Sequence, residues 1–450
     1  MTARHKTKFR LLSLMLFSLF LLGSPSLSKA NKNKQQILLI LTPYPKFITQ
    51  TYRSSFKKLY PDIELEVIKK GTNDAVEYLL DNKDENIVDI FWASSPESFK
   101  RLKAGNTLLT YSANTRAIPK VISGVQISDT NNTYTGYALS GYGFMWNTHY
   151  LKIKDLPIPH NWENLGESKY FGHIAMSTPS NSGTTHISVE SILQTRGWDN
   201  GWKLVKAIAA NSKDLSKRSV HVPKKVQKGE SGIGIVIDYY GLSSKAQSYP
   251  VNFAYSQPVI LLPASAAIIN NAPNPDAAKK FINFLVSPQG QSLLLDKKSR
   301  RIPILPATFD EAPADYPNPY EDEDLAETFD FDIELSVKRY DLVNEMFDAV
   351  ITNNFDQFSQ AAKQTLKLEH ALKNNNNEQA SQLLTQAKTA LMWMPNINSS
   401  KAQSDTFLTA FNQSRDTKAS FPKTWATEAK QQYQAAIKLA KEGLLLLDKS

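Results

Sequence analysis

Three short apolar runs follow one another early in the chain: ILLIL at residues 37–41, IELEVI at 63–68 and IVDIFW at 87–92. Each has the length of a strand, and the first is apolar throughout, as in a strand buried on both faces. Apolar residues with helical spacing separate the runs over residues 47–60 and 75–80. The resulting order β-α-β-α-β predicts a parallel sheet with helices on both faces.

Polar, turn-forming residues follow each of these runs. In a sheet of this kind, ligands gather at the carboxyl ends of the strands. Turns are often polar for conformational reasons alone, so a single polar turn carries little weight. Three in succession favour a binding site. The candidate ligand-binding residues in these turns are Thr42, Tyr44, Thr72, Ser94 and Ser95.

A second α/β unit follows over residues 130–245, and its central feature is the loop STPSNSGTTH at 177–186. The loop precedes an apparent helix at 187–195. Unpaired N–H groups and the positive end of the helix dipole make a helix N-terminus a site for anions. An ordinary Ser or Thr cap is the alternative, but capping alone rarely needs so many donors. The candidate ligand-binding residues of this loop are Ser180, Asn181, Ser182, Gly183, Thr184 and Thr185.

Residues 250–306 return to the first pattern, which indicates that the second unit is inserted into the first. Such an insertion needs more than one crossover strand and makes a hinge with a cleft between two lobes. The predicted fold is α/β, with two lobes on a hinged cleft. The predicted boundaries are 31–128 and 248–308 for lobe 1 and 129–247 for lobe 2.

The C-terminal part differs in kind. Fourteen acids stand against two bases between Asp310 and Asp348, and residues 309–324 are predicted to form an acidic linker. Beyond this linker, apolar residues keep helical spacing and no strand pattern appears. Residues 325–450 are therefore predicted to form an all-helical extension.

The N-terminus is typical of a secretory signal peptide over residues 1–30. A basic start precedes the apolar run 11–22, which is too short to span a membrane, and the small residues Ser28 and Ala30 suit cleavage near Ala30. Without these residues the chain carries 47 bases against 43 acids, a balance that does not call for nucleic acid. The absence of cysteine excludes disulfides and thiol chemistry.

Several motifs of the chain are similar to those of bacterial extracellular solute-binding proteins. They are ILLI at 37–40, FKKLYP at 56–61, DIFWASSP at 89–96, PHNWENL at 159–165, FGHIA at 171–175, NPDAA at 274–278 and FINFLVSPQGQ at 281–291. The resemblance covers residues 36–306 and implies a two-lobed type II periplasmic binding protein fold.

Within that family, residues 180–186 and the run GIGIVID at 232–238 most resemble the phosphoglycerate transport regulatory group. This group is related to ferric-iron binders and also carries a helical extension. The resemblance implies a periplasmic protein that binds phosphoglycerates. It also implies delivery of the ligand, or of its signal, to an inner-membrane permease or sensor protein.

A small phosphorylated acid needs hydrogen-bond donors and some positive charge. The hydroxyl loop supplies donors for the phosphate, and Arg218 is the candidate for a carboxylate or a second phosphate face. Its alternative is a solvated surface arginine. Asp238 would accept hydrogen bonds from ligand hydroxyls or pair with Arg218. Tyr239 is the last candidate ligand-binding residue.

Adjacent Tyr239 and Tyr240 leave a second interpretation open. Two phenolates after a strand resemble the tyrosine pair of ferric-binding proteins, and hard oxygen ligands suit a hard trivalent ion. Tyr44 would then contribute, and the hydroxyl loop would hold a synergistic anion. On this alternative the chain is the iron-binding component of an ABC transporter.

Catalytic motifs are missing from the sequence. It contains no Gly-x-Ser-x-Gly elbow, no phosphate-loop lysine motif and no His-Glu-x-x-His. His186 abuts the anion loop, where capping or ligand contact fits better than general-base catalysis. We therefore expect no enzymatic activity and no cofactor, with a hydrolase as a remote alternative.

Overall fold

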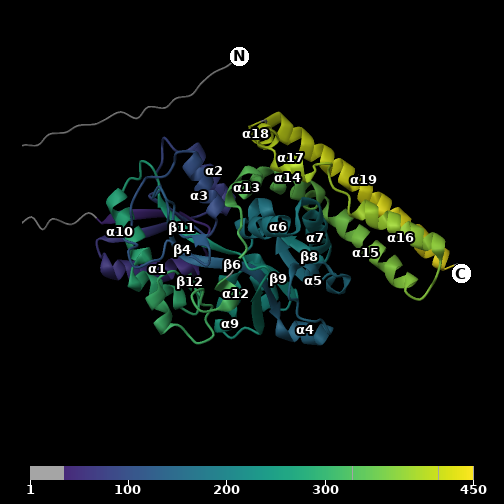
Figure 1. Cartoon of the computed structure of the whole chain (residues 1–450), viewed down its shortest axis with the longest axis horizontal. Coiled ribbons are helices and arrows are strands. Elements are labelled where there is room, and N and C mark those ends of the chain that lie inside the picture. Colours follow the sequence, from purple (N-terminus) through teal and green to yellow (C-terminus); the bar gives the residue numbers. More distant parts are fainter. Residues whose placement is uncertain (1–34, 327, 414, 449–450) are drawn as a thin grey trace, which may run out of the picture. The chain divides into compact units, whose positions relative to one another are not determined.

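The computed structural model describes residues 35–326, 328–413 and 415–448 (Figure 1). The predicted signal peptide lies outside the described residues. The predicted β-α-β-α-β order is present at the start of the described chain. Its elements are β1 (Gln36–Thr42), α1 (Lys46–Leu59), β2 (Ile63–Lys69), α2 (Thr72–Asp81), β3 (Ile90–Ala93) and α3 (Pro96–Ala104).

One buried carboxylate ties these elements together. Asp89 accepts hydrogen bonds from the N–H groups of Leu39 at 2.8 Å and Asn274 at 2.6 Å, which lie far apart in the sequence. Burial raises the pKa of Asp89, since desolvation disfavours its charged form. The motif that carries Asp89 thus joins β1 to the start of a distant helix.

The main sheet has the strand order β2-β1-β3-β11-β6-β9-β7-β8, with β10 and β12 also paired to β6. Its remaining strands are β6 (Thr135–Asn147), β7 (Ile174–Ser177), β8 (Ser212–Ser216), β9 (Ile233–Ile237), β10 (Val251–Tyr255), β11 (Leu261–Ile268) and β12 (Ile302–Pro303). A separate hairpin pairs β4 (Val121–Ile122) with β5 (Val125–Gln126).

The sheet is mixed: the parallel pairing predicted for the first three strands is confirmed, whereas the centre of the sheet is antiparallel. β1 pairs in parallel with β2 and β3, and β7 with β8 and β9, but β6 and β11 run antiparallel to their neighbours. The physical reason is the inserted unit: the chain that crosses into it must also return.

Strand β6 belongs to both halves of the sheet. Its residues 135–141 pair with β11, and its residues 142–146 pair with β9. We call the half with β1, β2, β3 and β11 lobe 1, and the half with β7, β8, β9 and β10 lobe 2. The exact boundaries predicted from sequence stay predictions.

Helices cover both lobes. Those of lobe 2 are α4 (Thr148–Lys154), α5 (Trp162–Gly166), α6 (Gly183–Arg196), α7 (Trp198–Ala210), α8 (His221–Gln227) and α9 (Asp238–Ala246), with the 3-10 turns η1 (Ser168–Tyr170) and η2 (Pro179–Asn181). Lobe 1 adds α10 (Pro275–Val286), α11 (Pro288–Ser292), η3 (Leu293–Leu295) and η4 (Pro306–Glu311).

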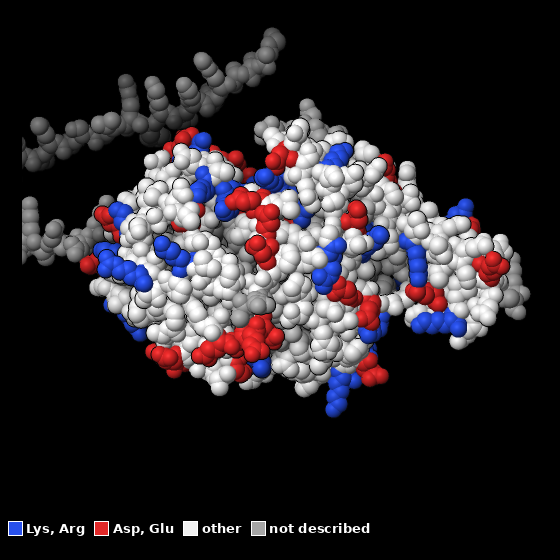
Figure 2. Space-filling view, viewed as in Figure 1, with Lys and Arg blue, Asp and Glu red and all other residues white. Residues whose placement is uncertain are grey.

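The segment predicted as an acidic linker packs onto lobe 1. Tyr316 donates to the carbonyl oxygens of Leu294 at 2.9 Å and Arg301 at 2.8 Å, and Tyr320 donates to that of Ile304 at 2.8 Å. Its acids remain exposed, and Figure 2 shows them gathered over α12 (Glu323–Ala326).

The helical extension packs on lobe 2, beside α6 and α7, and its helix α13 also packs on α3 of lobe 1 (Figure 1). Trp198 and Trp202 of α7 share one apolar core with Phe358 and Trp425 of the extension. Lys206 of α7 is buried and donates to the carbonyl oxygen of Trp393 at 2.7 Å. The helices are α13 (Ile333–Lys338), α14 (Tyr340–Val350), α15 (Phe355–Leu372), α16 (Glu378–Leu391), α17 (Ser399–Gln403), α18 (Asp405–Gln413) and α19 (Arg415–Leu447), with η5 (Thr352–Asn354).

Candidate functional site

A small pocket lies between the two lobes. Its volume of about 40 Å³ holds a few water molecules, so a larger ligand enters only when the lobes separate. Seven of its lining residues were singled out in the sequence: Tyr44, Thr72, Ser94, Gly183, Thr184, Tyr239 and Tyr240. Pro43, Ser219 and Ile237 complete the lining and were not predicted.

Three helices begin at this pocket. Thr72 is the first residue of α2, Gly183 is the first of α6, and Tyr239 lies in the first turn of α9. A helix N-terminus carries unpaired N–H groups and a partial positive charge. The pocket therefore offers N–H donors to an anion without a cationic side chain in its lining, while Asp74 and Asp238 stand in the first turns of α2 and α9.

The hydroxyl loop reaches the pocket through only part of its length. Helix α6 begins at Gly183, four residues before the predicted start, because Ser182 caps it by accepting from the N–H of Thr185 at 3.2 Å. Thr185 also donates its hydroxyl to Ser182 at 3.1 Å. These two hydroxyls are buried and satisfy each other, so their predicted role as ligand donors is not supported by the structure.

Ser180 and Asn181 also lie outside the pocket lining. Asn181 is exposed and donates to Thr178 at 2.9 Å. The carbonyl oxygen of Ser180 accepts a hydrogen bond from Asn73 of lobe 1. This contact joins the two lobes beside the pocket rather than presenting a donor to a ligand.

Two predicted residues of lobe 1 have structural partners instead. The Thr42 hydroxyl donates to the carbonyl oxygen of Trp92 at 2.6 Å and accepts from the N–H of Tyr44 at 3.1 Å. Ser95 is the N-cap residue of α3 and accepts from Ser98 at 2.9 Å. Both are buried and do not line the pocket.

Asp238 faces the sheet, not the pocket. Its carboxylate accepts from the N–H groups of Gly141 and Tyr239, each at 2.7 Å, and from the hydroxyl of Tyr255 at 3.3 Å. Burial raises the pKa of Asp238 to about 7. Neither of its predicted roles, ligand acceptor or partner of Arg218, is found.

Arg218 is partly exposed and does not line the pocket, although its neighbour Ser219 does. Burial, and then the nearby charges of Arg218 and Lys224, lower the pKa of Lys69 on lobe 1. Cationic side chains from both lobes thus lie close together here. The structure offers no direct support for Arg218 as the carboxylate ligand.

Arg301 is not among the residues predicted from the sequence. This side chain is fully buried directly before β12, and its Nη1 donates to Ser94 at 2.8 Å and to the Tyr44 hydroxyl at 3.3 Å. Its guanidinium carbon lies 4.3 Å from the ring centre of Tyr44 and 4.2 Å from that of Tyr239. The only signal in the sequence is a pair of arginines before an apolar run, which by itself does not indicate contact with Tyr44, 257 residues away.

The tyrosine pair of the iron alternative does line the pocket. The rings of Tyr239 and Tyr240 lie 4.3 Å apart, and burial raises the pKa of both phenols. No carboxylate or histidine lines the pocket, and no cluster of three such metal-binding side chains exists among the described residues. The lining therefore offers phenols without the anionic ligands that would complete a ferric site.

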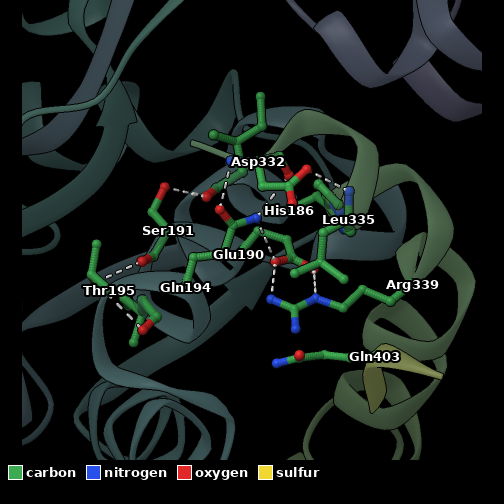
Figure 3. A network of polar contacts seen from close by, with 12 residues as sticks. His186, Glu190, Ser191, Gln194, Thr195, Asp332, Leu335, Arg339 and Gln403 are labelled. Atoms are coloured by element: carbon green, nitrogen blue, oxygen red, sulfur yellow. Dashed lines mark hydrogen bonds and ion pairs between the residues drawn. The ribbon is translucent and has the colours of Figure 1, made fainter. Parts of the chain in front are cut away.

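His186 contacts the extension instead of the pocket. Its Nδ1 lies 2.8 Å from the side-chain oxygen of Asn344 and its Nε2 lies 3.4 Å from Ser336. Figure 3 shows this histidine within a network that joins α6 to α13, in which Arg339 forms a two-pronged ion pair with Glu190 at 2.6 and 2.7 Å. The helix that begins at the pocket is thus held along its length by the extension.

A larger hollow of about 780 Å³ lies on lobe 1, lined in part by Tyr60, Arg116 and Asn283. None of the predicted ligand-binding residues lines it. We therefore regard the smaller pocket between the lobes as the candidate site.

A two-lobed α/β fold with a small pocket between the lobes, at which three helices begin, is typical of proteins that bind a small solute. The sequence profile of the bacterial extracellular solute-binding proteins matches residues 85–337, and the chain belongs to this family. Its fold is that of the two-lobed periplasmic binding proteins, with a C-terminal helical region added. No helix in the described part of the chain is long and apolar enough to cross a membrane.

Particular relatives can be named. The phosphoglycerate transport regulatory protein PgtC of Salmonella typhimurium is 29% identical over 341 residues, which cover 76% of this chain and 81% of PgtC. The periplasmic binding protein AfuA of Actinobacillus pleuropneumoniae, solved with fructose-6-phosphate bound, has a TM-score of 0.62 at 20% identity and covers 70% of this chain and 98% of its own. Iron-bound HitA of Pseudomonas aeruginosa has a TM-score of 0.53 at 16% identity, covering 65% and 92%.

Proposed function

We propose that the protein binds a small phosphorylated organic acid of the phosphoglycerate type between its lobes. One observation carries the proposal: three helix N-termini meet at a pocket whose lining contains no carboxylate. N–H groups at helix starts hold phosphate well, because they combine donors with the positive ends of the dipoles. The names of two relatives, a phosphoglycerate transport regulator and a binder solved with a sugar phosphate, support the same ligand chemistry.

The proposed setting is the periplasm, reached through a signal peptide cleaved near Ala30. The protein would pass the ligand or its signal to an inner-membrane permease or sensor, and it would need no catalysis and no cofactor. Hinge motion between lobe 1 and lobe 2 would open the pocket to the ligand. Fractionation of cells, with an N-terminal sequence of the exported protein, tests the location and the cleavage site.

Calorimetric titration of the purified protein with 3-phosphoglycerate tests the ligand. We expect binding that is weakened by inorganic phosphate as a competitor. The double substitution Thr72→Val with Thr184→Val removes one pocket hydroxyl from each lobe, so the affinity should fall. The control is Thr110→Val, an exposed threonine of lobe 1 outside the pocket. Failure of every phosphorylated acid to bind the wild type would rule the proposal out.

A ferric-binding function is the second candidate, favoured by the adjacent phenols of Tyr239 and Tyr240 at the pocket. It predicts a visible tyrosinate charge-transfer band on addition of ferric citrate. Loss of that band in Tyr239→Phe would establish iron as the cargo and make the α6 loop an accessory anion site.

A further inference from the structure

Arg301 is a buried cation without a carboxylate bonded to it. Its side chain has no exposed surface, and its Nε and Nη2 have no hydrogen-bond partner among the described residues. The nearest acid with an electrostatic effect on it, Asp238, directs its oxygens to Gly141, Tyr239 and Tyr255 instead. Buried guanidinium groups are normally paired, because an unpaired buried charge is costly.

The guanidinium lies behind the lining of the pocket, in contact with residues that form it. Its Nη1 donates to Ser94, and its planar group lies between the rings of Tyr44 and Tyr239, three residues that all line the pocket. Tyr44 follows β1 and Arg301 precedes β12, so both belong to lobe 1. Tyr239 belongs to α9 in lobe 2. Separation of the lobes would therefore remove the Tyr239 ring from one face of the guanidinium and open it to the cleft.

We propose that Arg301 binds a second anionic group of the ligand, a carboxylate, while the three helix N-termini hold its phosphate. The inference rests on the proposed function and narrows it to acids with two anionic ends. The planar fork of arginine matches a carboxylate through two parallel N–H donors, and Nε and Nη2 form such an edge. The carboxylate of the bound ligand would thus accept hydrogen bonds from Nε and Nη2 of Arg301.

This arrangement also bears on the iron alternative. A cation held between two of the pocket phenols opposes a trivalent cation at the same place, since like charges repel strongly in a buried site. The same charge attracts a dianionic ligand. Arg301 thus selects for the charge of the cargo as well as its shape.

The experiment compares two ligands that differ in one group. 3-Phosphoglycerate carries a phosphate and a carboxylate, whereas glycerol 3-phosphate carries only the phosphate. We expect the wild type to bind 3-phosphoglycerate roughly 10- to 100-fold more tightly, the usual range for charge-assisted hydrogen bonds. Arg301→Met should abolish this preference, so that the variant binds the two ligands with similar affinity. The control Arg116→Gln removes an exposed arginine of the same lobe and should keep the preference.

Thermal melting separates this function from a structural role. Replacing an unpaired buried cation by an apolar side chain of similar length should leave the melting temperature unchanged or raise it. Should Arg301→Met fail to fold, Arg301→Lys keeps a charge without the fork, and it should reduce the preference while glycerol 3-phosphate still binds.

Three outcomes would overturn the inference. A wild type that binds both ligands equally refutes the carboxylate site but leaves the phosphate proposal standing. A lysine variant with full preference, or a methionine variant that loses both ligands and melts lower, makes Arg301 a structural residue. A wild type that binds neither ligand refutes the proposed function itself.

Discussion

The ion pair between Arg339 and Glu190 is almost wholly buried, with side-chain exposures of 2% and 0%. It joins α6, which begins at the pocket, to the residue of the extension between α13 and α14 (Figure 3). Such a pair contributes little net stability against an apolar replacement, but removing one partner leaves a buried charge alone. The pair therefore fixes how the extension contacts α6 rather than adding much net stability.

Arg339→Met should lower the free energy of unfolding by about 3–5 kcal/mol, because Glu190 is left buried and unpaired. The double variant Arg339→Met with Glu190→Leu should recover most of this loss. Urea denaturation measures both. The control is Lys338→Met, which removes the neighbouring charge from an exposed pair with Asp405 and should have little effect. A single variant as stable as the control would contradict the prediction.

Glu97 should make stability depend on pH. Burial raises the pKa of Glu97 to about 7, and its carboxylate accepts from Ser336 of α13 at 3.1 Å. Between about pH 4.5 and 7 the folded state then binds more protons than the unfolded state, so stability falls as the pH rises through this window.

Glu97→Gln should reduce the change in the free energy of unfolding over this pH window by up to roughly 3 kcal/mol. Burial also raises the pKa of Asp238 to about 7, so Asp238 should contribute the same pH dependence to the wild type and the variant. Denaturation curves at pH 5, 6, 7 and 8 give the comparison. Equal slopes in wild type and variant would show that Glu97 is ionised in the folded state throughout the range.

At the start of helix α6, two nearby side chains have different roles. Ser182 caps the helix, whereas Thr184 lines the pocket. Ser182→Ala should cost about 1 kcal/mol of stability, the usual value for a lost N-cap. Thr184→Val should leave the melting temperature nearly unchanged but weaken phosphate-ligand binding roughly tenfold. Calorimetry and thermal melting of both variants would refute this division if the two effects were reversed.

In the folded chain, the extension and lobe 2 share one apolar core. Trp198 and Trp202 pack in one apolar cluster with Phe358, Trp425 and Tyr433. Deleting residues 325–450 would expose this cluster and would strip Lys206 of both its partners, Trp393 and Tyr433. An uncovered apolar face of this kind makes a chain prone to aggregate.

We therefore expect the truncated chain to aggregate or to melt more than about 10 °C below the full chain. Light scattering and calorimetric melting test this. A truncated protein that melts like the full chain and binds ligand normally would show that the extension is a separate docking domain, as its sequence alone also allows.

Local pattern determined much of the fold. The predicted strands at 37–41 and 63–68 and the predicted helix at 47–60 agree with β1, β2 and α1 to within one residue at each end, because their apolar pattern is strong and is bounded by turn residues. Local sequence pattern also identified seven residues of the pocket, because ligands of such folds bind at strand ends and helix starts, which the pattern locates.

Tertiary structure alone decided which polar side chains face the ligand. Thr42 and Asp238 lie beside pocket-lining residues, but bonds to the distant residues Trp92 and Gly141 turn them inward. Ser95 and Thr185 are bonded within their own helix starts, to Ser98 and Ser182. Arg301 shows the converse: nothing in its local sequence sets it apart, and packing alone places it beside Tyr44, 257 residues away. Periodicity is a property of neighbouring residues, whereas the direction of a side chain at the end of an element depends on what packs against it.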